Sequence, residues 1–179
     1  MSVDITDTIR KNQIIVFVVS PKGFSKQLQN ITKSLAGQKK GICYVSLNKP
    51  FTSIKTGLEK MKIDASNLYF IDAVSSKVSS VEPDKKTIFV SSPQALTEIS
   101  IAINKGIGLW KADAVLFDSL STLLVYEGAS SVIRFVHSVT NSLRVKGLTC
   151  VFTILKPDLK DELAKDIGMF ADSIEELGK

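Results

Sequence analysis

The chain has 179 residues, of which 44% are hydrophobic and 23% charged, and its formal net charge is +5. This length suffices for one domain with a sizeable core, and these fractions are ordinary for a globular protein. The composition excludes a membrane span, because no apolar run approaches the roughly 20 residues that one requires. The acidic first residues are also unlike a secretory leader. We therefore expect one domain over residues 1–179, located in the cytoplasm.

Apolar runs and amphipathic stripes alternate in the first half of the chain. The continuous apolar run 14–19 predicts a strand that is covered on both faces. We then expect a helix over 24–37, a strand over 42–47, a short helix that starts near Pro50, and a strand over 67–71. The inner faces of the two helices consist of apolar residues: Phe24, Leu28, Ile31 and Leu35 in the first, and Phe51, Ile54, Leu58 and Met61 in the second.

The middle of the chain is the least regular part. Residues 73–86 contain serines, lysines and a proline without a core pattern, which predicts an exposed, mobile loop within the domain. A short strand is expected over 87–90. Ser92 then predicts a helix cap, with Pro93 at the first helical position. The inner face of that helix is expected to carry Leu96, Ile99 and Ile103.

The last third continues the same alternation. A strand over 114–117 ends at Asp118, a long amphipathic helix follows Gly128, and another strand is expected over 148–154. Residues 170–177 fit a helix or a strand equally well. A further amphipathic helix is marked by three apolar residues: Leu159, Leu163 and Ile167.

Strands that alternate with helices at this spacing predict an α/β fold of three layers, in which helices cover both faces of a mainly parallel central sheet. In such a sheet, ligands bind at the carboxyl ends of the strands. Five segments are expected to meet at that edge: residues 20–26, 47–49, 71–72, 118–122 and 153–156.

The segment after the first strand stands where a nucleotide-binding protein places its phosphate loop, G-x-x-x-x-G-K-[ST]. Ser20 and Ser25 occupy the two glycine positions, Lys26 the lysine position and Gln27 the Ser/Thr position. Lys26 retains a charge that neutralises phosphate, whereas the Gln27 amide is a poor replacement for a hydroxyl that binds magnesium. Gly23 alone offers the backbone freedom that lets N–H groups curl around phosphate. The alternative interpretation is a plain strand–turn–helix corner.

A second candidate is Asp118, at the end of an apolar strand on the same edge. A carboxylate in this position is the Walker-B arrangement, which holds the magnesium of a bound nucleotide. The alternative is an aspartate that caps the following turn.

Together these features resemble the RecA superfamily, specifically its KaiC- and RadA-like ATPases. The resemblance covers nearly the whole chain and rests on YVSL at 44–47, LFDSLSTLL at 116–124 and ADSIEEL at 171–177. It implies a RecA-like P-loop fold, a phosphate loop formed by Ser20, Gly23, Ser25, Lys26 and Gln27, and a metal ligand at Asp118. It also implies assembly through subunit faces near the nucleotide.

The chain departs from this family where the chemistry is done. Asn48 and Lys49 stand where the resemblance implies glutamates that polarise water, and Gln27 stands where it implies a magnesium-binding hydroxyl. Removing one such element typically costs orders of magnitude in rate. We therefore expect a pseudo-ATPase without catalytic residues or a cofactor, which regulates or scaffolds through a protein partner or self-association. The alternatives are a slow ATPase or nucleotide-binding module that uses Lys26 and Asp118, and a DNA-binding RecA paralogue.

The remaining signals add little to these hypotheses. Cys43 and Cys150 fall in apolar runs and predict buried, reduced thiols, and two thiols are too few for a zinc site. His137 is expected on the flank of its helix. Lysine clusters permit nucleic-acid binding but do not favour it, because few arginines or aromatic residues stand among them.

Overall fold

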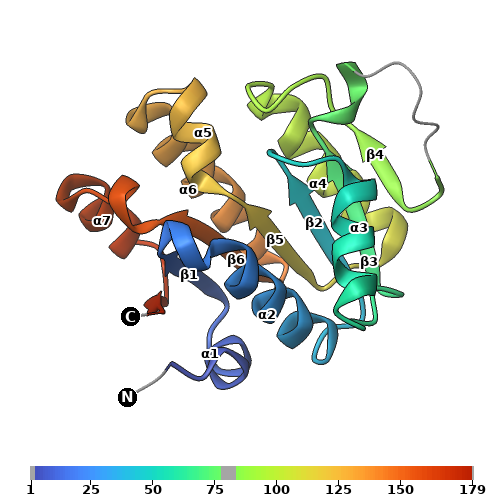
Figure 1. Ribbon diagram of the computed structural model, residues 1–179. Helices are drawn as coiled ribbons and strands as arrows, with labels where there is room; N and C mark the ends of the chain where they lie inside the picture. Colours follow the sequence, from blue (N-terminus) through green and yellow to red (C-terminus); the bar gives the residue numbers. More distant parts are fainter. Residues whose placement is uncertain (1–2, 78–83, 179) are drawn as a thin grey trace.

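The structure is a computed structural model that describes residues 3–77 and 84–178 (Figure 1). Within these residues one sheet of seven strands forms the middle layer, in the order β4–β3–β2–β5–β6–β1–β7. All neighbouring strands run parallel. The strands are β1 (Ile14–Val19), β2 (Ile42–Ser46), β3 (Leu68–Asp72), β4 (Thr87–Phe89), β5 (Ala114–Asp118), β6 (Thr149–Leu155) and β7 (Ser173–Leu177).

Helices cover both faces of this sheet (Figure 1). One face is covered by α1 (Ile5–Lys11), α2 (Phe24–Ala36) and α3 (Phe51–Lys60). The other is covered by α4 (Leu96–Trp110), α5 (Leu120–Tyr126), α6 (Ala129–Val145) and α7 (Asp161–Gly168). Short 3-10 turns are η1 (Pro21–Gly23), η2 (Ser75–Lys77) and η3 (Lys156–Asp158). The three-layer α/β/α fold with a parallel central sheet is confirmed.

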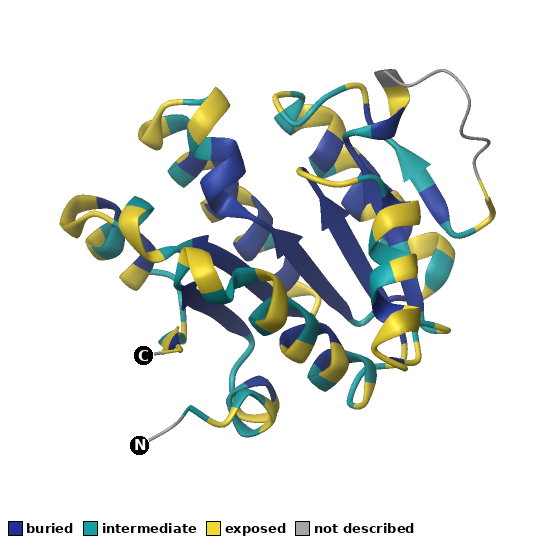
Figure 2. Cartoon of the chain, viewed as in Figure 1, coloured by how far each residue is buried: buried dark blue, intermediate teal, exposed yellow. Residues whose placement is uncertain are grey.

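The central strands are buried on both sides, which explains their unbroken apolar sequences (Figure 2). In β1, Val16 packs into the core beneath α4 and α6, whereas Phe17 packs into the core beneath α2 and α3. Alternate side chains of a strand point to opposite faces, so one strand supplies both cores. The thiols of Cys43 and Cys150 are buried and not disulfide-bonded, and burial raises the pKa of the Cys43 thiol to about 12.

Most of the predicted elements are confirmed, and residues 170–177 contain the strand β7 rather than a helix. Two details are wrong. The helix expected at Ser92 and Pro93 begins at Leu96, because the Ala95 N–H bonds to the Ser92 carbonyl and closes a turn first. Met61 lies beyond the end of α3 and is 54% exposed instead of facing inward.

The segment 73–86, predicted as an exposed loop, begins with two buried residues, Ala73 and Ser75. Both are held at the carboxyl edge of the sheet, since the Ala73 N–H bonds to the Ser46 carbonyl at the end of β2 and Ser75 bonds to Asp72 at the end of β3. Residues 78–83 lie outside the described residues.

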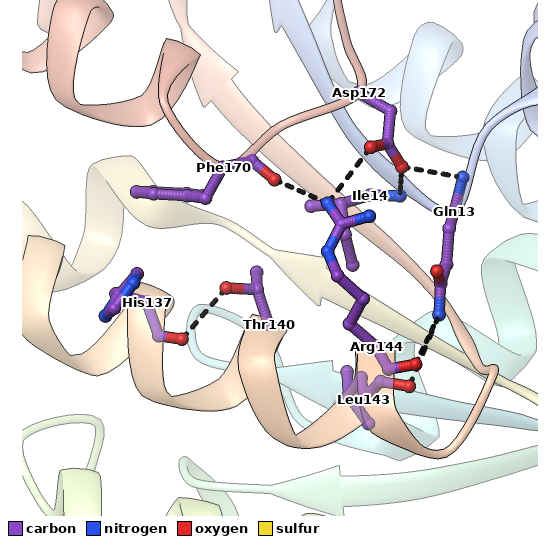
Figure 3. A network of polar contacts seen from close by, with 8 residues as sticks. All are labelled: Gln13, Ile14, His137, Thr140, Leu143, Arg144, Phe170 and Asp172. Carbon is purple, nitrogen blue, oxygen red and sulfur yellow. Dashed lines mark hydrogen bonds and ion pairs between the residues drawn. The ribbon is translucent and has the colours of Figure 1, made fainter.

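A polar network fastens the amino end of the sheet (Figure 3). Asp172, just before β7, accepts hydrogen bonds from the Gln13 and Ile14 N–H groups at 3.0 and 2.8 Å. Arg144, near the end of α6, donates to Asp172 at 3.0 Å and to the Phe170 carbonyl at 2.8 Å. Burial of Asp172 acts to raise its pKa, but these bonds outweigh it and hold the pKa below its usual value. The network thus joins β1, α6 and β7.

Candidate functional site

The carboxyl end of β5 presents a buried aspartate with an unsatisfied oxygen. Asp118 is 2% exposed, and the Tyr44 hydroxyl of β2 donates to its Oδ2 at 3.1 Å. Its other oxygen, Oδ1, has no hydrogen-bond partner within the described residues. Buried polar atoms are nearly always hydrogen-bonded, so this oxygen marks Asp118 as a candidate ligand-binding group.

The charge of Asp118 is costly in this position. Burial raises its pKa to about 6, although the Tyr44 hydrogen bond and the Lys49 ammonium act to lower it. Burial, together with the Asp118 charge and hydrogen bond, also raises the Tyr44 pKa well above its ordinary value. Tyr44 therefore stays protonated and donates to an aspartate that ionises close to neutral pH.

A cavity of about 140 Å³ adjoins this aspartate between α2 and α3. Its floor includes Asp118 and Tyr44, and its α2 wall includes Ser25. Lys49, in the segment between β2 and α3, and Ser53 of α3 also line it, as do Gln29 and Thr32 of α2. Apolar side chains form much of the remaining wall: Leu28, Ile54 and Leu58.

The predicted phosphate loop folds as a tight turn with its own internal hydrogen bonds. The Gly23 N–H bonds to the Ser20 carbonyl at 3.1 Å and to the Ser20 Oγ at 3.3 Å. The Phe24 N–H bonds to the Pro21 carbonyl, and α2 begins at Phe24. A phosphate cradle needs N–H groups that point outward and are available to the anion. The N–H groups of Gly23 and Phe24 do not fit that requirement.

The other members of that loop are separated by the first turn of α2. Ser25 faces the cavity of Asp118, but Lys26 and Gln27 are absent from the cavity lining within the described residues. Lys26 is exposed, and the Gln27 side chain accepts a hydrogen bond from Asn30 at 3.2 Å. Of the predicted site residues, the structure thus brings only Ser25 and Asp118 to one cavity.

The two residues at the end of β2 point to different places. Lys49 lines the cavity of Asp118, whereas Asn48 lines a second hollow of about 370 Å³ with Phe24 and residues of α5. The hydroxyl of Ser46, the last residue of β2, donates to the Lys49 carbonyl and fixes the turn between them. Two exposed apolar residues, Val125 at 78% and Tyr126 at 50%, border the second hollow.

Asp72, at the end of β3, shows what a satisfied carboxylate looks like on the same edge. It accepts four hydrogen bonds: from the Phe51 N–H at 2.9 Å, the Val74 N–H at 2.7 Å, the Ser75 N–H at 2.9 Å and the Ser75 hydroxyl at 2.6 Å. These bonds fasten the start of α3 and the segment after β3 to the sheet. Asp72 is therefore a structural residue.

Sequence reasoning missed Tyr44 and Ser53 as site residues. A signal for Tyr44 was present, because a phenol inside a fully buried strand usually finds a polar partner for its hydroxyl. Ser53 gave no such signal, since it is one of many serines in the chain and its role depends on how α3 packs against α2.

Comparison with known proteins defines the class to which this fold belongs. The fold is similar to the crystal structure of a KaiC-like protein from the hyperthermophilic archaeon Pyrococcus horikoshii, with a TM-score of 0.62 and 12% sequence identity. The match covers 90% of this chain and 69% of the Pyrococcus protein. The protein therefore has a RecA-like fold of the KaiC type. Its sequence matches a family of unknown function, DUF7504, over residues 58–176, and the chain belongs to that family. Comparison with curated proteins returns no match.

Two general features complete the description. None of the helices in the described residues combines the length and apolar character needed to cross a membrane. Within the same residues, no group of three or more histidine, cysteine, aspartate or glutamate side chains is placed to hold a metal ion. Asp118 fits a cation ligand by its Oδ1 oxygen, but it is a single carboxylate.

Proposed function

We propose that the protein is a non-catalytic RecA/KaiC-like domain that regulates or scaffolds through a protein partner. One observation carries the proposal: the N–H groups of Gly23 and Phe24 are bonded inside the turn that would otherwise hold phosphate. A nucleotide at this turn would have to break those bonds before it gained any of its own.

The charge beside Asp118 supports the same conclusion. An ammonium such as that of Lys49 cannot accept a proton from an attacking water, so it cannot replace a glutamate base. It also lowers the pKa of Asp118 in the direction that a bound cation would. Lys49 thus partly compensates the carboxylate without any metal chemistry.

The second hollow supports a protein partner. Exposed apolar groups that gather at a hollow are a common property of interaction surfaces, and tyrosine is enriched at such surfaces. Val125 and Tyr126 combine with the partly buried Phe24 in this way, on the same edge of the sheet as Asp118.

Hydrolysis and nucleotide binding test the first half of the proposal. We expect purified protein with Mg-ATP to release no phosphate above background, and its Tm to stay unchanged with Mg-ATP or Mg-ADP, because a ligand of the native state must raise Tm. Phosphate release that Asp118→Ala abolishes would contradict the proposal.

Association tests the second half. We expect Val125→Asp and Tyr126→Ser to weaken self-association, or the retention of co-purified proteins, by about tenfold or more. Val145→Asp is a matched control, because Val145 is 90% exposed and lies at the far end of α6. If the Val125 and Val145 substitutions weakened association equally, the proposal that α5 forms the interaction surface would be rejected.

The second candidate is a nucleotide-binding module or slow ATPase, and the unpartnered Oδ1 of Asp118 favours it. That oxygen is of the type that magnesium prefers. This candidate predicts a rise in Tm with Mg-ADP that both Lys26→Ala and Asp118→Asn remove, whereas Lys22→Ala leaves it intact. A Tm that does not move with Mg-ADP rejects it.

A further inference from the structure

The cavity between α2 and α3 carries both signs of charge. Asp118 lies at its floor with an unsatisfied oxygen, and Lys49 lies at its exposed side. Lys49 forms no ion pair of its own within residues 3–77 and 84–178. A carboxylate oxygen that lacks a donor and an ammonium without an ion pair among these residues therefore line the same small space without bonding to each other.

We propose that this cavity binds a small aliphatic zwitterion, a molecule with a protonated amine and a carboxylate such as a free amino acid. The site would give the domain a small-molecule input that is separate from its protein contacts. It goes beyond the proposed regulatory function and does not depend on it.

The inner end of the cavity suits an ammonium group. Oδ1 of Asp118 accepts no hydrogen bond, and the Tyr44 oxygen can accept one because its own proton is donated to Oδ2. The hydroxyls of Ser25 and Ser53, both exposed residues, also line the cavity. An ammonium has three N–H donors, so it can bond to the Asp118 and Tyr44 oxygens at once.

The outer end suits a carboxylate. The Lys49 ammonium would attract an anionic group and repel a simple cation, whereas Asp118 would repel a simple anion. A zwitterion is the class of small molecule that pairs with both the buried Asp118 carboxylate and the exposed Lys49 ammonium.

The size and the lining of the cavity limit which zwitterions can bind. The cavity has a volume of about 140 Å³. One water needs roughly 10–15 Å³ by the same kind of measure, so the cavity can hold a molecule of several non-hydrogen atoms. The apolar side chains of Leu28, Ile54 and Leu58 favour an aliphatic portion over a polar one. Gly57 of α3 lines the same space and leaves room beside them.

Calorimetric titration with L-valine as the probe tests the proposal. Isobutylamine and isobutyrate serve as matched compounds that keep the aliphatic part and one charge each. We expect L-valine to bind with a measurable Kd and each single-charge compound to bind at least about tenfold more weakly. Absence of L-valine binding up to about 10 mM, where any Kd tighter than that would register, overturns the proposal. Equal binding of isobutylamine and L-valine overturns it as well.

Variants show whether the bound molecule occupies this cavity. Asp118→Asn and Lys49→Gln should each weaken L-valine binding by about tenfold or more, whereas Lys22→Gln, an exposed lysine of η1, should not. Gly57→Leu should block the cavity while both charges remain, and its melting curve shows whether it is folded. Unchanged binding in folded Gly57→Leu or in Lys49→Gln would place the ligand elsewhere and overturn the proposal.

Discussion

Two buried aspartates on one edge of the sheet differ in almost everything except their position. Asp72 ends β3 and Asp118 ends β5, and Ser46 of β2 pairs with both of them in register. Asp72 accepts four hydrogen bonds, whereas Asp118 accepts one and leaves an oxygen unsatisfied. Both carboxylates are buried and both end a strand. The hydrogen-bond donors around them therefore decide which one is structural and which one can bind a ligand.

The difference has a local origin. After Asp72, the chain turns back so that the Val74 and Ser75 N–H groups face the carboxylate, which is a common turn for aspartate. After Asp118, Ser119 is extended and α5 begins at Leu120, so the backbone leaves the carboxylate at once. The Ser121 hydroxyl, which could have turned back, accepts a hydrogen bond from the Leu155 N–H instead.

The largest expected change in stability comes from replacing Asp72, the aspartate whose oxygens are all hydrogen-bonded. Asp72→Ala should lower the free energy of unfolding by about 3–5 kcal/mol, because it leaves three N–H donors, two of them buried, without an acceptor. Urea unfolding measures this loss, and Asp161→Ala, at an exposed position, serves as the control. A loss no larger than that of the control would break the comparison.

Asp118→Asn should have the opposite sign. Because the pKa of Asp118 is raised from 3.8 to about 6, its ionisation destabilises the folded state as pH rises through this interval. The substitution should therefore stabilise the protein by about 2–3 kcal/mol at pH 8 relative to its effect at pH 4. Unfolding measured across this range gives the difference, and a difference that is independent of pH would contradict it.

Asp172, at the opposite edge of the sheet, sharpens the comparison as a half-exposed case (Figure 3). Its pKa is lowered, so its bonds stabilise the protein above its ordinary pKa and are lost as pH falls through the folded value. Asp172→Asn should cost about 1–2 kcal/mol at pH 7, a figure reduced for solvent screening of the Arg144 pair. Urea unfolding of Asp172→Asn at pH 7 and pH 3 should show the cost shrinking in acid.

The smallest expected effect concerns the space beside Asp118. A Cβ at Gly57 would meet Gln29 at 3.9 Å, an ordinary contact, so Gly57→Ala should fit within α3. It should stabilise the protein by roughly 0.5–1 kcal/mol, because alanine loses less backbone freedom in a helix than glycine. Thermal unfolding measures the gain. A clear loss would mean that α2 and α3 pack more tightly over Asp118 than the cavity suggests.

Much of the fold could be predicted from sequence, because long periodic segments carry their own signal. The run at β1 and the stripe of α6 are examples, and Gly147, which ends α6, has the positive φ of 68° that glycine favours. α1 and α5 escaped prediction because each spans only seven residues, too few to establish a helical period. The start of α4 was misplaced because Pro93 suits a turn as well as a first helical turn.

The site was predicted less completely than the fold. Asp118 could be identified because an acidic residue interrupts an apolar strand at the ligand edge. Because Asn48 and Lys49 are adjacent in sequence, on sequence alone we expect them in the same site. Consecutive residues in a turn point to different sides, however, and the two side chains line different cavities. The Ser20 hydroxyl accepts a hydrogen bond from the Gly23 N–H only in one side-chain rotamer, and no sequence pattern predicts that rotamer.

The position of β1 between β6 and β7 has a consequence for how the chain is made. Its residues pair with partners far along the chain, as Ile14 does with Cys150 and Ile15 with Ser173. During synthesis the first strand therefore emerges long before either of its neighbours exists, whereas β2 meets β3 early. Strand β1 is therefore made before the other strands of this sheet but is among the last to pair, and its apolar residues stay accessible to chaperones until then.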